Sequence, residues 1–86
     1  MGFHVFDTYV KSKDGHTMHF DVITDKNNLE NAIIFAKEWL NSIGEKDAVV
    51  TTKECRFCHT QSVSEEIEIE IMTSGYFIAK MEGCPN

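Results

Sequence analysis

The sequence contains no apolar run approaching the ~20 residues that a membrane-spanning helix needs, so an integral membrane protein is not expected. Its N-terminus lacks the basic and apolar regions of a secretory signal, which favours a cytoplasmic location. Lys and Arg total only eight, against fourteen Asp and Glu, and the cations do not cluster along the chain. Because nucleic acids and anionic membrane surfaces are bound by clustered cations, neither is an expected partner.

Sequence motifs of several enzyme classes are missing as well. There is no Walker phosphate loop, no Gly-x-Gly-x-x-Gly and no recognisable Ser/His/Asp set, so we expect no catalytic machinery. The single proline and the 26% of charged residues are ordinary for a globular protein. A length of 86 residues predicts one domain, spanning 1–86, with one modest core.

The first part of the chain predicts a β-hairpin. Residues 3–10 are rich in aromatic and β-branched side chains, which is typical of a strand. Asp14 and Gly15 predict a tight turn, because both residue types tolerate positive φ. Residues 16–23 then form the antiparallel partner strand.

Alternation along this hairpin assigns its side chains to two faces. We expect Asp7 on one face together with Phe3, Val5, Tyr9, Met18, Phe20 and Val22. The other face is expected to hold Phe6, Val10, His19, Asp21 and Ile23. Asp7 then points inward, where a carboxylate needs hydrogen-bond partners from a loop or a helix N-terminus, or acts as a functional carboxylate beside a histidine. The second face is so apolar that either the helices cover both faces or this face meets another chain, which predicts a homodimer through the sheet face.

The remaining elements complete a small α/β fold. Apolar residues at helical spacing over 29–43 predict a helix, capped by Asp25 or Asn27 and ended at Gly44. Residues 48–52 predict a third strand that runs into Cys55. Residues 62–72 alternate like a strand but open with a capping box, which favours a second helix, and residues 76–81 predict the last strand.

The predicted element order is therefore ββαβαβ. This order predicts an α/β fold of the α+β two-layer type, with a mixed four-stranded sheet and two helices. Strands joined through a crossover helix run parallel, so we expect the third and fourth strands to end at the same edge of the sheet.

The three cysteines are the main candidates for chemistry. Cys55 and Cys58 form a Cys-x-x-Cys pair followed directly by His59, and Cys84 lies near the end of the chain. If the third and fourth strands are parallel, their ends bring all three sulfur atoms to one edge, where the first strand also places His4. A tetrahedral Cys₃His zinc site is expected from this set, with either histidine as the fourth ligand.

Other interpretations of these cysteines stay open. They could be reduced thiols that pack as small hydrophobes. Cys55 and Cys58 could form a thiol-redox pair, because a nearby helix start lowers a thiol pKa. The Cys-x-x-Cys-His pattern also matches c-type haem attachment, although that chemistry requires export. A plain protein-interaction module acting through the sheet face would need none of them.

Six stretches of the sequence together carry a family resemblance: residues 4–10, 18–22, 36–40, 42–44, 54–59 and 80–84. The chain resembles a small bacterial family, the "domain of unknown function twenty twenty-four" family. The resemblance implies a stand-alone cytoplasmic α/β domain of this length, and it carries over neither an activity nor catalytic residues. We therefore expect a non-catalytic binding or regulatory module that depends on a metal or a thiol.

Overall fold

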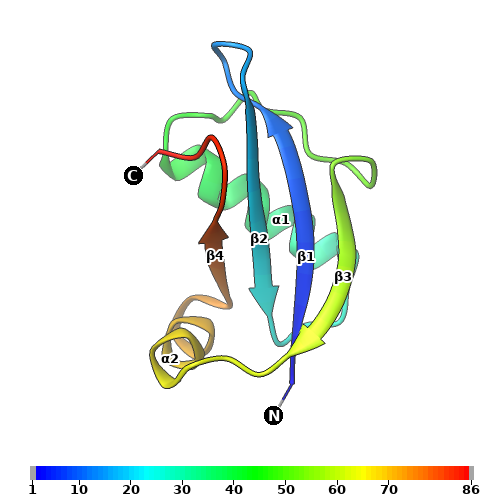
Figure 1. Cartoon of the computed structure of the whole chain (residues 1–86), viewed down its shortest axis with the longest axis vertical. Helices are drawn as coiled ribbons and strands as arrows, with labels where there is room; N and C mark the ends of the chain where they lie inside the picture. The colour runs from blue at the N-terminus through cyan, green and yellow to red at the C-terminus, as the bar shows by residue number, and fades with distance from the viewer. Residues whose placement is uncertain (1, 86) are drawn as a thin grey trace.

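The computed structural model describes residues 2–85 and shows six elements in the predicted order ββαβαβ (Figure 1). They are β1 (Phe3–Lys11), β2 (Thr17–Thr24), α1 (Leu29–Ser42), β3 (Cys55–Gln61), α2 (Glu65–Ser74) and β4 (Tyr76–Lys80). The predicted α+β class is confirmed. Neither helix in residues 2–85 is long and apolar enough to cross a membrane.

The four strands form one sheet in the order β3-β1-β2-β4, and every neighbouring pair is antiparallel. The predicted mixed sheet is therefore wrong in its strand directions. Strands β2 and β3 do run in the same direction, as a crossover through α1 requires, but β1 lies between them (Figure 1). The chain then returns through the short helix α2, and β4 pairs with β2. Strands β3 and β4 therefore lie at opposite edges of the sheet and run in opposite directions.

The hairpin turn decides which side chains share a face. Five residues, 12–16, connect β1 to β2, and Lys11 pairs with Thr17. Only Gly15 in this loop has a positive φ, of 91°. A two-residue Asp-Gly turn would shift the pairing by one position, and a shift of one residue moves every side chain of a strand to the opposite face. The side chains of β2 were therefore predicted on the wrong faces of the sheet.

The observed register places the apolar residues Phe6, Val10, Met18, Phe20 and Val22 together on one face. Helix α1 covers this face with Ala32, Ala36 and Leu40, and all eight side chains are buried. Helix α2 lies on the other face and packs Ile71 against Phe3, Val5 and Ile23. The helices thus cover both faces, which was one of the two predicted alternatives; the homodimer stays a prediction.

Both helices carry clear capping signals, shifted slightly from the predicted ones. Asn28 caps α1 by accepting a hydrogen bond from the Asn31 backbone N–H, so the cap lies one residue after the predicted Asn27. Ser64, rather than Ser62, caps α2, and three glutamates follow in its first turn, where the helix dipole favours negative charge. Gly75 ends α2 at a φ of 93°, as predicted.

The third strand lies later in the chain than predicted. Residues 48–52 form a loop in which Val50 is buried in the core. This apolar segment is therefore packed into the core without pairing as a strand. A turn follows, closed by hydrogen bonds from Glu54 and Cys55 N–H to the Thr51 carbonyl. Strand β3 then begins at Cys55, so the Cys-x-x-Cys segment is itself a strand.

Candidate functional site

The structure does not bring the three cysteines together. Cys55 is fully buried in the core under α1, where the Thr8 hydroxyl donates to its sulfur. Cys58 is exposed, at a bulge in the β3–β1 pairing. Cys84 follows β4 and donates its thiol proton to the His19 carbonyl, so two strands, β1 and β2, lie between it and β3. Among residues 2–85, no cysteine belongs to a group of three or more potential ligands close enough to share one metal ion.

Among the hydrogen bonds of residues 2–85, the two histidines of the predicted zinc set contact only one of its cysteines, Cys58. His59 contacts Cys58, with 3.1 Å between Nδ1 and the sulfur. His4 has its Nδ1 3.4 Å from the Thr60 hydroxyl, and its ring lies 6.3 Å from that of Phe57. The Cys₃His site is therefore not formed, because the topology that supported it is not the observed one.

A different group of polar residues meets on the face that α1 does not cover. Asp7 of β1 and Asp21 of β2 are direct cross-strand partners. Like charges in this position repel each other, so two opposed carboxylates are a costly arrangement in the middle of a sheet. Asp21 is only 8% exposed, and its Oδ1 has no hydrogen-bond partner. A buried polar atom without a partner costs free energy, and it therefore calls for a functional explanation.

His19 and Tyr9 form the next cross-strand pair on this face. The His19 Nε2 lies 3.1 Å from a carboxylate oxygen of Asp7, and the His19 ring stacks on the ring of Tyr9 at 4.0 Å. Helix α2 covers the part of the face around Phe3, Val5 and Ile23, and Tyr9 remains half exposed. Solutes can therefore approach the polar half of the face from the Tyr9 end.

The pKa values of the two aspartates move in opposite directions. Burial, reinforced by the hydrogen bond and negative charge of Asp7, raises the pKa of Asp21 to about 7. Its hydrogen bond with Asp21, together with His19, lowers the pKa of Asp7. The pair therefore keeps one proton up to a pH near 7, which is the usual way in which adjacent carboxyls avoid a double charge.

A metal ion can take the place of that proton. One ligand atom each of Asp7, His19 and Asp21 lies within 4.8 Å of the other two. Among residues 2–85, no other group of three or more His, Cys, Asp or Glu side chains comes this close together. Carboxylate oxygen and imidazole nitrogen are common ligands of divalent transition metals. Three ligands on an open face leave further coordination positions for water or a small ligand.

Sequence reasoning had singled out Asp7 beside a histidine but had placed Asp21 and His19 on the opposite face. The available signal was an aspartate in the middle of each hairpin strand. Pairing outward from Asp14 as the centre of an odd-numbered loop brings Asp7 against Asp21 and places His19 on the same face.

Comparison with known proteins supports the resemblance seen in the sequence. The family model described as "Domain of unknown function (DUF2024)" matches residues 1–81. The NMR structure of protein NE1680 from Nitrosomonas europaea is similar, with a TM-score of 0.90 and 59% sequence identity, covering 99% of this chain and 100% of that chain. No curated protein matches the chain. Because the family model spans nearly all of its length, the chain belongs to the DUF2024 family.

Proposed function

We propose that this domain is a binding module for a divalent transition-metal ion, with Zn²⁺ as the first candidate, held by Asp7, His19 and Asp21. The observation that carries the proposal is the buried Asp21 carboxyl, which faces a second carboxyl and leaves one oxygen without a partner. A divalent cation would supply that partner and cancel the repulsion between the two aspartates.

The distances support such a site after a small adjustment of the side chains. Three ligands at 2.0–2.2 Å from one zinc ion lie about 3.4 Å from one another in a tetrahedral arrangement. The three ligand atoms already lie within 4.8 Å of each other, on neighbouring strands whose backbones are fixed by ladder hydrogen bonds. Rotation about side-chain bonds is then sufficient, and the backbone keeps its place.

Zinc titration of chelator-stripped protein by calorimetry tests the proposal. We expect one equivalent of Zn²⁺ to bind, and Asp21→Asn to weaken that binding by roughly 100-fold or more, since loss of an outer-shell partner alone costs 10–100-fold. A binding isotherm of Asp21→Asn that overlays the wild-type isotherm would refute the site.

Two matched variants separate this site from other zinc-binding groups. Asp14→Asn removes an exposed aspartate that also contacts a histidine, His16, but has no third ligand. Cys58→Ser removes the exposed thiol. Both are expected to bind Zn²⁺ with wild-type affinity; loss of binding in Cys58→Ser with retention in Asp21→Asn would move the metal to the thiol and overturn the proposal.

A further inference from the structure

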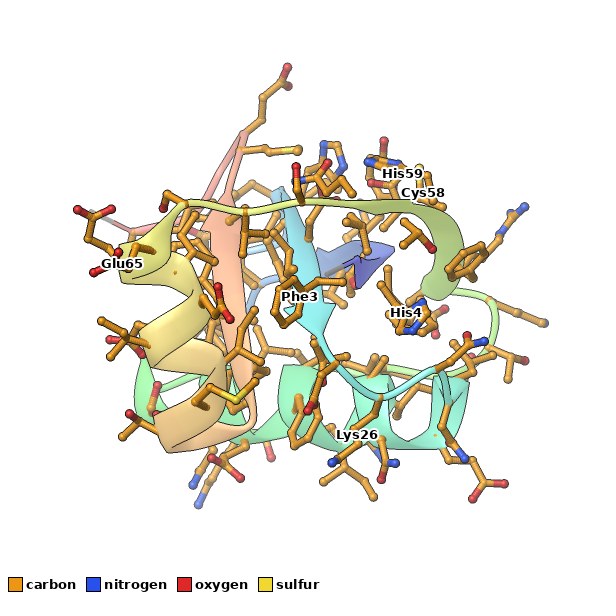
Figure 2. The ribbon with its side chains drawn as sticks, turned by 90° about the horizontal axis from the view of Figure 1, so that it is seen from below. Phe3, His4, Lys26, Cys58, His59 and Glu65 are labelled. Atoms are coloured by element: carbon orange, nitrogen blue, oxygen red, sulfur yellow. The ribbon has the colours of Figure 1, made fainter. Side chains whose placement is uncertain are left out.

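Strand β3 carries a second arrangement of reactive groups, beside a depression that Asp7 also lines. Cys58 is exposed, and His59 Nδ1 lies 3.1 Å from its sulfur. The other ring nitrogen of His59, Nε2, lies 2.7 Å from the side-chain carbonyl oxygen of Gln61. Figure 2 shows Cys58 and His59 together on the side of the sheet away from α1.

The hydrogen bond to Gln61 fixes which nitrogen of His59 carries the proton. An amide carbonyl oxygen only accepts hydrogen bonds, so Nε2 is the donor in this contact. A neutral imidazole has one N–H, and Nδ1 therefore presents its lone pair to the thiol of Cys58. The geometry suits transfer of the thiol proton to His59, with Gln61 as a positioning residue.

The other two cysteines lack this arrangement. Burial raises the pKa of Cys55, whose side chain is fully enclosed in the core. Burial likewise raises the pKa of Cys84, whose thiol donates to a backbone carbonyl. The thiolate is the reactive form of cysteine, so Cys55 and Cys84 are expected to react more slowly than Cys58. They serve as internal controls for the reactivity of Cys58.

A surface depression of about 490 Å³ lies beside Cys58. Its lining residues are Asp7, Tyr9, Lys53, Glu54, Arg56, Phe57 and Cys58. The Glu54 carboxylate is occupied by the backbone N–H and hydroxyl of Thr51. Among the ion pairs of residues 2–85 none involves Lys53 or Arg56, so both cations are available to a carboxylate of a bound molecule.

We propose that Cys58 is a site of reversible thiolation by low-molecular-weight disulfides that carry carboxylate groups. His59 accepts the proton of the Cys58 thiol, and the thiolate attacks one sulfur of the disulfide. The S–S bond of the small molecule breaks as a new S–S bond to Cys58 forms, and the departing thiolate takes the proton from His59. Cys58 is oxidised and the small disulfide is reduced, with no other reactant.

The mixed disulfide persists because no second cysteine can displace it. Cys55, three residues earlier on the strand, is buried under α1, whereas Cys58 borders the depression on the opposite face. The Cys-x-x-Cys pair therefore does not close an internal disulfide, as the redox-pair interpretation of the sequence required. Cys58 is a modification site, and the small molecule stays attached until an external thiol releases it.

Reaction with 5,5′-dithiobis(2-nitrobenzoate), a dianionic disulfide, tests the proposal in chelator-treated protein, where the outcome does not depend on metal binding. At pH 7 we expect one thiol per chain to react, roughly tenfold or more ahead of the other two. Cys58→Ser should remove this fast phase and Cys84→Ser should leave it unchanged. A fast phase that survives Cys58→Ser would overturn the assignment.

Variants of the neighbouring residues test the mechanism. His59→Gln should slow the fast phase roughly tenfold or more at pH 7 but not near pH 10, where thiols ionise without a base. Gln61→Ala should slow it at pH 7, and Gln61→Glu, which keeps the acceptor oxygen, should restore it. Equal rates for His59→Gln and wild type at pH 7 would refute the role of His59.

Disulfide probes of different charge test whether the depression beside Cys58 binds carboxylates. Arg56→Gln should slow reaction with the dianionic disulfide and leave reaction with neutral bis(2-hydroxyethyl) disulfide unchanged, because only the former carries carboxylates. Other charged or titratable groups that face Cys58 across the depression are Asp7, Tyr9, Lys53 and Glu54, and Arg56→Gln leaves them in place. The same loss of rate with both probes would show that Arg56 does not select the anion.

Discussion

Phe20→Ala is expected to lower the free energy of unfolding by about 3–5 kcal/mol, the usual cost of emptying the space of a buried phenylalanine. Phe20 is completely buried in the core under α1, and its ring lies 4.7 Å from that of Trp39. A domain of 86 residues has a total stability of roughly 4–13 kcal/mol, so this one change removes a large part of it.

Urea unfolding followed by far-UV circular dichroism measures the effect. Phe57→Ala is the matched control, because Phe57 is 52% exposed and loses much less buried surface. We expect the control to cost less than about 1.5 kcal/mol. Equal losses in the two variants would contradict the core described here.

Asp21→Asn is expected to stabilise the metal-free protein at pH 8 by about 1–3 kcal/mol while it weakens Zn²⁺ binding by roughly 100-fold or more. The amide can donate to the Asp7 carboxylate and ends the conflict between two acidic groups. The wild-type protein should itself lose stability as the pH rises from about 4 to about 7, because folded Asp21, with its pKa raised from 3.8 to about 7, keeps a proton that the unfolded chain releases. The lowered pKa of Asp7 acts in the opposite sense, but only below this range.

Urea unfolding at pH 5 and pH 8 in the presence of a chelator measures this difference. The free-energy gain of Asp21→Asn over wild type should be larger at pH 8 than at pH 5. Asp47→Asn, an exposed aspartate in the loop before β3, should show no gain at either pH. A variant less stable than wild type at pH 8 would mean that the Asp21 carboxyl is structurally required.

Local signals in the sequence predicted most of the elements. The apolar stripe and Gly44 predicted α1, and the acidic first turn with Gly75 predicted α2 against a competing strand-like alternation. These signals work because caps and helical periodicity depend on residues a few positions apart. The cap positions shifted by one or two residues, which is the usual uncertainty at a helix end.

Strand pairing could not be predicted in the same way. The register of the hairpin depends on the parity of the loop length, and Asp14-Gly15 suggested an even loop where the structure has an odd one. The segment 48–52 has high β propensity but buries Val50 instead of pairing, because burial of an apolar side chain outweighs local propensity.

Prediction of the candidate site from the sequence was limited in the same way. Cys55, Cys58 and Cys84 are conspicuous in the sequence, yet their convergence depended on parallel third and fourth strands, and β3 and β4 run in opposite directions. Asp7 was noticed as a carboxylate among apolar neighbours, but its partner Asp21 became visible only once the register was known. Pairing of distant residues depends on the sheet as a whole, whereas the adjacency of Cys58 and His59 can be read directly from the sequence.

The division of the sheet between two helices has a consequence for the history of such a domain. The fold is stabilised by the apolar side chains buried under α1 and by the smaller group buried under α2. Neither group contains Asp7, His19 or Tyr9. Relatives can therefore exchange these side chains without losing the buried contacts that stabilise the fold. Divergence within this lineage should then concentrate on the uncovered half of one face.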